Sequence, residues 1–251
     1  MTRLCIVQHH PLETPGYVLT WAQARGMQVR VQQAWALEAW PNSQDFDAII
    51  LLGGPFGVAD ADALPWLADE ITWLQRCVDT GMPIFAICLG AQLLAHCLGA
   101  KVTRMAATEL HEAAELGWIK VNFCAELAAL GQFRPVLQWH EDTFEIPPGA
   151  HALAYSSVGQ INQGFKLADR ALMGVQFHPE WSASVYASLI DCLATPQTSA
   201  PLRAALNHPG LFDSQEALCM ALLDFWMRIS TRPDLAARPL TPRHLHTDCV
   251  H

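Results

Sequence analysis

Cys88 stands where the sequence changes from a buried strand to a helix, which is a favourable position for a nucleophile. It follows the apolar run 84–87 and precedes a helical pattern that should end at Gly99. The unpaired backbone N–H groups and the dipole of a helix N-terminus favour the thiolate form of a cysteine. The small neighbours Ala86 and Gly90 would allow the sharp turn of a nucleophile elbow. The alternative is a core cysteine, because free cysteine is often buried.

His178 and Glu180 follow a second apolar run, at 171–177, within the tripeptide His-Pro-Glu. Imidazole can accept the proton of a cysteine thiol and later return it to a leaving group. A carboxylate two residues further along can accept a hydrogen bond from the other ring nitrogen and so orient the ring. The sequence therefore suggests a triad of Cys88, His178 and Glu180, although the tripeptide could simply cap a helix expected at about 182–193.

Gly53, Gly54 and Pro55 follow a third apolar run, at 47–52. Such a tripeptide is most often a tight turn after a strand. If it lies beside the elbow, glycine N–H groups and the N–H of Leu89 can stabilise the oxyanion that forms when a thiolate attacks a carbonyl group. The order of glycine loop, elbow cysteine and His-x-Glu is more specific than any one of these motifs.

Strands and helices alternate along the first half of the chain, and they must position these motifs. The pattern predicts strands at 4–7, 28–32, 47–52 and 84–87, and helices between them at 17–25 and 64–80. Because the strand runs are continuously apolar, the expected fold class is α/β, with a mainly parallel central sheet flanked by helices. Ligands then bind at the carboxyl ends of the strands, where Cys88 and His178 both lie.

After residue 101 the pattern changes to short β-like segments, which should extend the sheet with antiparallel strands. These segments lie at 117–123, 136–139, 152–156 and 164–168. Residues 195–201 resemble a linker between a first domain, 1–195, and a C-terminal helical extension, 196–251. In that extension, a helix from about residue 213 or 214 to 229 carries an apolar stripe. We expect it to pack on the core of the chain, and a partner interface is the alternative.

Residues 1 to about 195 resemble the class I glutamine amidotransferase family. The resemblance rests on the order of a glycine-rich loop, a cysteine elbow close to G-x-C-x-G-x-Q and a late H-P-E. It implies a flavodoxin-like α/β fold. It also implies that Cys88 is the nucleophile, that His178 is the base and that Glu180 is the acid that orients the histidine.

The same resemblance assigns further groups of the site. It implies that the backbone N–H groups of Gly54 and Leu89 form the oxyanion hole, and that Gly53 and Gln92 bind the substrate. One departure is Ala86, where the family usually has glycine, although alanine is small enough for an elbow.

Three motifs are similar to the GMP synthase-like amidotransferases in particular. They are Leu-Leu-Gly-Gly-Pro at 51–55, Glu-Leu-Gly-Trp at 115–118 and Trp-His-Glu-Asp at 139–142. This similarity implies that His140 and Asp142 lie near the substrate pocket.

The resemblance implies a small-molecule substrate, glutamine or another γ-glutamyl compound, and no metal or other cofactor. Cys88 would attack the side-chain amide, release ammonia and leave a γ-glutamyl thioester, which water hydrolyses to glutamate. The sequence has no G-x-x-x-x-G-K-[ST] phosphate loop, and the roughly 56 residues after residue 195 are too few for a synthetase domain. A separate synthetase or acceptor subunit would then use the ammonia. The alternatives are a hydrolase of γ-glutamyl peptides or conjugates, and a catalytically silent regulatory or binding module.

The composition fits a cytoplasmic enzyme. A net charge of −9, with no cluster of Lys and Arg, argues against nucleic-acid binding. No apolar stretch or N-terminal signal predicts contact with a membrane. Eight cysteines without C-x-x-C spacing argue against disulfides and a zinc ribbon. Assembly into a homo-oligomer is left open.

Two further groups of histidines are weaker candidates. The segment 9–13, His-His-Pro-Leu-Glu, should form the entry loop of the next helix, and the alternative is that it lines the mouth of the pocket. His244, His246, Cys249 and His251 more readily form a mobile tail than a metal site.

Overall fold

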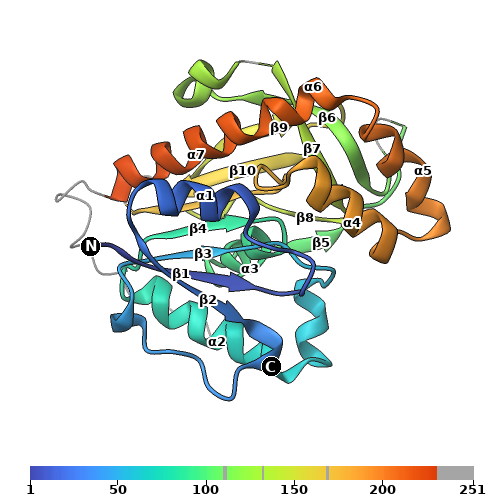
Figure 1. The fold of residues 1–251 in the computed structure, drawn as a ribbon. Helices are drawn as coiled ribbons and strands as arrows, with labels where there is room; N and C mark the ends of the chain where they lie inside the picture. The colour runs from blue at the N-terminus through green and yellow to red at the C-terminus, as the bar shows by residue number, and fades with distance from the viewer. Residues whose placement is uncertain (110–111, 132, 168–169, 231–251) are drawn as a thin grey trace.

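The central sheet runs through the whole molecule, and parallel strands form one half of it (Figure 1). The computed structural model describes residues 1–109, 112–131, 133–167 and 170–230. In this part of the chain the nine strands of the sheet have the order β2-β1-β3-β4-β11-β10-β9-β6-β7. The parallel strands are β1 (Arg3–Gln8), β2 (Gln28–Gln33), β3 (Ala48–Leu51), β4 (Ile84–Ile87) and β11 (Leu172–Val175).

The other half of the sheet is antiparallel, as the short β-like segments predicted. Its strands are β6 (Glu115–Phe123), β7 (Phe133–His140), β9 (Ala150–Ser156) and β10 (Asn162–Leu167). A separate pair is formed by β5 (Val102–Arg104) and β8 (Asp142–Phe144). The fold class is therefore the predicted α/β class with an antiparallel extension, and of the predicted strand 164–168 only Ala168 lies outside the described residues.

Helices cover both faces of the parallel half (Figure 1). On one face lie α1 (Gly16–Ala24) and α7 (Gln215–Ser230), and on the other lie α2 (Pro65–Asp79) and α3 (Leu89–Cys97). Successive residues of β1 point to opposite faces, so that Leu4 and Ile6 join the core beneath α1 and α7 whereas Cys5 and Val7 join the core beneath α2 and α3. Burial on both faces explains the continuously apolar runs of β1, β3 and β4, whereas the edge strand β2 is mostly exposed.

Shorter elements complete the described chain. The 3-10 helices are η1 (Ala34–Ala36), η2 (Ser43–Asp45), η3 (Val58–Asp62) and η4 (Ala125–Leu130). Three helices lie between β11 and α7, namely α4 (Ala183–Leu193), α5 (Pro196–Ala205) and α6 (Pro209–Asp213). No helix among the described residues combines the length and the apolar character needed to cross a bilayer.

The prediction of a linker at residues 195–201 is wrong, because helix α5 begins there. The side chain of Thr195 accepts a hydrogen bond from the N–H of Thr198, and Pro196 occupies the first helical position, where its missing N–H costs nothing. The proline-rich composition therefore marks the start of a helix.

Helix α7 packs on the core of the chain, as its apolar stripe predicted. Leu218, Leu222 and Trp226 are fully buried together with Trp21 of α1. The indole N–H of Trp226 donates to the carbonyl oxygen of Ala171 at 2.9 Å. The C-terminal helices thus share the core of the preceding chain. The four tail residues considered as a metal site, at 244, 246, 249 and 251, lie outside the described residues.

Candidate active site

A cavity of about 1140 Å³ opens at the carboxyl ends of the parallel strands. The residues that line it come from the loops after β1, β3, β4 and β11, from α3 and the segment that runs from it through β5, from the β7–β8 segment, and from α4. Six of the nine residues that the sequence suggested for the site line this cavity, namely Gly54, Cys88, Gln92, His140, Asp142 and His178. The other three, Gly53, Leu89 and Glu180, lie directly behind this lining.

Cys88 occupies a strained turn between β4 and α3. Its φ of 50° lies in a region that non-glycine residues rarely adopt, and such strain is concentrated at functional sites. The turn also needs Gly90, because a Cβ atom there would lie 2.6 Å from the Cβ of Leu51. Ala86, in contrast, fits within β4, where it pairs with Leu51 and Gly174. The geometry is therefore that of an elbow, with the thiol at the N-cap position of α3.

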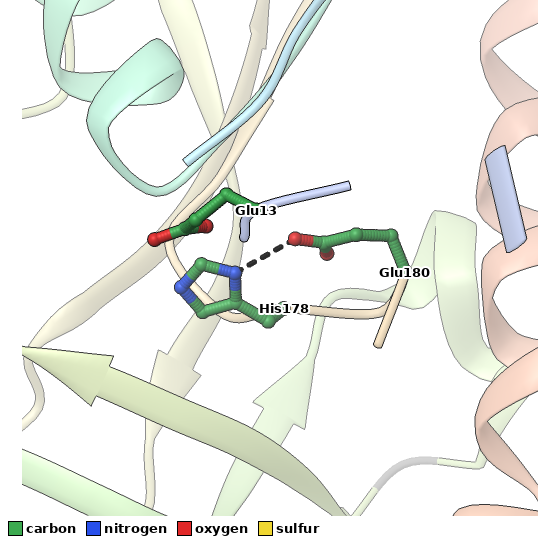
Figure 2. A group of neighbouring side chains, drawn as sticks. All are labelled: Glu13, His178 and Glu180. Atoms are coloured by element: carbon green, nitrogen blue, oxygen red, sulfur yellow. Dashed lines mark hydrogen bonds and ion pairs between the residues drawn. The ribbon is translucent and has the colours of Figure 1, made fainter. Parts of the chain in front are cut away.

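The imidazole of His178 is held on two sides. Nδ1 of the ring lies 2.8 Å from Oε1 of Glu180 (Figure 2). The ring of Trp181 stacks on the imidazole, with the ring centroids 3.4 Å apart and the planes inclined by 11°. The side-chain amide of Gln215 donates to the backbone carbonyl of His178 at 2.8 Å. These contacts fix the ring in one orientation.

The surroundings of His178 favour its protonated form. Burial opposes the charge, but the carboxylate of Glu180, the sulfur of Cys88 and the hydrogen bonds with both residues outweigh it and hold the pKa of His178 well above its usual value. A protonated imidazole beside a thiolate is the ion pair that a cysteine nucleophile requires. The side-chain amide nitrogen of Gln176 also lies near the sulfur, 3.6 Å from Sγ of Cys88.

Glu13 brings a second carboxylate to His178, and sequence reasoning suggested no role for this residue beyond the mouth of the pocket. Its carboxylate lies beside the imidazole ring on the side away from Glu180 (Figure 2), and its buried Oε2 atom has no hydrogen-bond partner among the residues that the structure describes. Burial raises the pKa of Glu13 to about 7, and the charge of Glu180 acts in the same direction, while His178 and His9 oppose the rise. The only signal in the sequence is an acidic residue shortly after the end of the first strand.

The glycine loop after β3 packs tightly between its neighbours. A Cβ atom on Gly53 would lie 2.6 Å from Cε1 of His178, and one on Gly54 would lie 2.8 Å from the Cβ of His9 and 2.9 Å from Cδ2 of Leu89. Contacts under 3.0 Å would force the neighbouring atoms to move. Both positions thus require glycine, and the loop brings the two predicted oxyanion donors, Gly54 and Leu89, next to each other.

Three of the four residues suggested for substrate binding, Gln92, His140 and Asp142, are tied into one polar network. The side-chain amide of Gln92 donates to the carbonyl oxygen of Asp142 and to Oε1 of Gln176, each at 3.2 Å. His140 contacts the same Asp142 carbonyl through Nδ1 and Glu115 through Nε2, each at 2.9 Å. The Asp142 carboxylate faces the loop at Gly57, where burial raises its pKa. Both ring nitrogens of His140 are therefore engaged within the network at the cavity wall.

One group among the described residues has the composition of a metal site. Glu13, His178 and Glu180 each offer a ligand atom, and these atoms all lie within 4.8 Å of one another. The 2.8 Å separation of the His178 and Glu180 atoms is, however, that of a direct hydrogen bond. The arrangement is thus that of an imidazole between two carboxylates, one bonded to it and one beside it.

Comparison with a protein-family model gives a match over most of the chain. The model described as glutamine amidotransferase class-I matches residues 19–191. The match includes the glycine loop, the cysteine elbow and the His-Pro-Glu segment, and it ends within α4.

Curated relatives and a solved structure agree with this match. The chain is 36% identical over 141 residues to a subunit of the glutamine-hydrolyzing GMP synthase of Sulfurisphaera tokodaii, covering 55% of this chain and 69% of that protein. It is 33% identical to the glutamine-hydrolyzing GMP synthase of Anaplasma marginale, covering 57% of this chain but only 29% of that longer protein. The crystal structure of a glutamine amidotransferase from Thermotoga maritima superposes with a TM-score of 0.78 at 24% identity, covering 92% of this chain and 99% of the other, which supports the fold.

Proposed function

Because this chain belongs to the class-I glutamine amidotransferase family, we propose that Cys88, His178 and Glu180 carry out its hydrolysis of glutamine. The observation that carries this assignment is the geometry of His178. Its Nδ1 is bonded to Glu180 at 2.8 Å, which leaves the other ring nitrogen for Cys88 at the start of α3. A cysteine, a base and a group that orients the base are the components of nucleophilic catalysis.

In the first half of the reaction, the thiolate of Cys88 forms a bond with the side-chain carbonyl carbon of glutamine. The carbonyl oxygen becomes an oxyanion, which the N–H groups of Gly54 and Leu89 stabilise. When the oxyanion collapses, the carbon–nitrogen bond breaks, and His178 donates its proton to the departing ammonia. A γ-glutamyl thioester on Cys88 remains.

In the second half, water replaces ammonia. Neutral His178 accepts a proton from the water molecule as its oxygen attacks the thioester carbon, and a second oxyanion forms in the same place. Collapse of this oxyanion breaks the carbon–sulfur bond, releases glutamate and restores the Cys88 thiolate beside protonated His178. Gln92, within the network at the cavity wall, and Gly53, behind His178, would position the glutamine side chain, while His140 and Asp142 shape the cavity.

We further propose that a separate synthetase or acceptor subunit receives the ammonia. Two observations support this: the Sulfurisphaera relative is named as one subunit of a GMP synthase, and the longer Anaplasma relative extends well beyond the region matched by this chain. Addition of the partner should increase the rate of glutamine hydrolysis, and ¹⁵N from the side-chain amide should appear in the partner's product. We also propose that the protein is cytoplasmic, because the cysteines of its sequence lack the spacing of a disulfide framework.

Ammonia release from glutamine tests the catalytic assignment. Cys88→Ser should reduce the rate by at least about 10³-fold, because loss of a nucleophile removes the covalent route. Cys192→Ser, on the exposed part of α4, makes the same chemical change away from the cavity and should leave the rate unchanged. Equal rates for Cys88→Ser and the wild type would disprove the assignment. A strong preference for γ-glutamyl dipeptides over glutamine would contradict the proposed substrate.

A further inference from the structure

His9 and Glu70 form a buried pair behind the glycine loop. His9 directly follows β1, and Glu70 lies in the middle of α2. Nε2 of His9 lies 2.8 Å from Oε1 of Glu70, and neither side chain is exposed to solvent. Trp66 stacks on the imidazole with the ring centroids 6.4 Å apart. The proposed reaction gives neither residue a chemical step, yet burial of two ionisable groups is costly unless their contacts compensate for it.

Both ring nitrogens of His9 face oxygen acceptors. While Nε2 faces the Glu70 carboxylate, Nδ1 lies 3.1 Å from the carbonyl oxygen of Gly53. A carbonyl oxygen and an ionised carboxylate only accept hydrogen bonds, so with Glu70 ionised both nitrogens carry hydrogen and the ring is an imidazolium. Burial opposes this charge, but Glu70, the Gly53 carbonyl and nearby Glu13 outweigh burial and raise the pKa of His9. His9 therefore donates a charge-assisted hydrogen bond to the Gly53 carbonyl.

That hydrogen bond fixes the direction of the next N–H group. The carbonyl of Gly53 and the N–H of Gly54 belong to one peptide unit, which is trans like every peptide bond in the described chain. In a trans unit the two groups point in opposite directions. A carbonyl held towards His9 therefore directs the Gly54 N–H away from His9, and Gly54 is a residue of the cavity wall together with Cys88.

We propose that the His9–Glu70 pair is a positioning device that holds the Gly53–Gly54 peptide in the orientation required for the oxyanion hole. His9 fixes the peptide, and Glu70 keeps His9 charged and fixes its ring. This inference rests on the proposed function, because it assigns the Gly54 N–H to the oxyanion of that reaction. Position 54 also requires glycine, because a Cβ atom there would lie 2.8 Å from the Cβ of His9.

Two near-isosteric substitutions of His9 separate this role from simple stabilisation. In His9→Asn the amide nitrogen can take the place of Nδ1 and still donate to Gly53, whereas in His9→Gln it takes the place of Nε2 and faces Glu70. We expect His9→Gln to lower kcat for glutamine by about 10²-fold with little change in KM, as loss of an oxyanion donor does. His9→Asn should retain kcat within about tenfold of the wild type, since it keeps the donor to Gly53.

Alkylation of Cys88 by iodoacetamide provides a readout that does not use the oxyanion hole. In this reaction the sulfur displaces iodide at a saturated carbon, so no oxyanion forms. Its rate, followed at Cys88 by peptide mass spectrometry, should be the same in both His9 variants and the wild type. His151→Gln, on an exposed position of β9, is the matched control for the substitution itself. Glu70→Gln offers an independent route and should lower kcat about tenfold, again without slowing alkylation.

The results distinguish three cases. Loss of kcat in His9→Gln with retained alkylation and recovery in His9→Asn supports the proposal. Equal kcat in His9→Gln and the wild type overturns it, and so does a parallel loss of kcat, alkylation and thermal stability in both His9 variants. If Cys88→Ser hydrolyses glutamine as fast as the wild type, the proposed function itself has failed, whatever the His9 variants do.

Discussion

Replacing Glu13 by Gln should change the way in which stability depends on pH. The wild-type carboxyl group is buried beside His178 and Glu180, and burial raises its pKa from 4.5 to about 7. The folded state therefore binds a proton between these two pH values that the unfolded state has already released. By linkage, this group makes the folded protein less stable as pH rises from about 4.5 to about 7, and the loss persists above pH 7.

The size of the effect follows from the two pKa values. At about 1.4 kcal/mol for each pH unit, the rise from 4.5 to about 7 corresponds to roughly 3 kcal/mol over the full range. Between pH 5 and pH 8, where both states can be measured, the wild type should lose about 2–3 kcal/mol through this group. Gln has a similar shape and does not titrate. Relative to the wild type, Glu13→Gln should therefore gain about 2–3 kcal/mol between pH 5 and pH 8.

Urea unfolding at pH 5, 6, 7 and 8 measures this difference directly. Effects of the substitution that do not depend on pH, such as altered packing, cancel when the two pH values are compared. Glu38→Gln makes the same change on an exposed side chain and should give a difference that stays constant with pH. If the free-energy difference between Glu13→Gln and the wild type is equal at pH 5 and pH 8 within about 0.5 kcal/mol, the argument from burial is refuted.

Two further substitutions test the packing of the site and of the C-terminal helix. Gly53→Ala would place a methyl group 2.6 Å from Cε1 of His178. Because a displaced catalytic group loses its alignment, kcat for glutamine should fall by about 10²-fold. In the control variant Gly210→Ala the new methyl group meets nothing within 4 Å, so kcat should be unchanged. Trp226→Ala should lower the free energy of unfolding by about 3–5 kcal/mol in urea titrations, because it leaves a cavity at a fully buried site. Glu216 is exposed on the same helix, and Glu216→Ala should lower the free energy of unfolding by less than about 1 kcal/mol. Similar losses for both variants would contradict the burial of α7.

The parallel strands and their reactive ends were predictable because each depends on a short stretch of sequence. The run at 84–87 is apolar throughout because β4 is buried on both faces, and the small residue Gly90 permits the turn at Cys88. The same reasoning located β11 and the His178–Glu180 segment after it. In contrast, residues 195–201 were misjudged because composition alone does not distinguish a proline-rich linker from the capped first turn of α5.

Long-range polar pairs could not be predicted, because no local pattern records them. His9 and Glu70 are 61 residues apart and meet only when α2 packs beneath the sheet. From the sequence alone, each is an ordinary polar residue, His9 in a loop and Glu70 on an amphipathic helix. Glu13 is a similar case, since its raised pKa depends on burial beside His178 and Glu180, which follow the distant strand β11 in the sequence. The reacting groups can therefore be predicted from the sequence more readily than the residues that orient them or shift their pKa.

The strand order explains why the glycine loop is the point where these holding contacts converge. β3 lies between β1 and β4, and all three strands are parallel, so the loops that follow them lie side by side at one edge of the sheet. Gly54, directly after β3, therefore lies between His9, which follows β1, and Leu89, which follows β4. No side chain fits there. The orientation of its peptide must then be set by the neighbouring loops and not by its own sequence, which is why the charged donor on His9 can determine where the Gly54 N–H points.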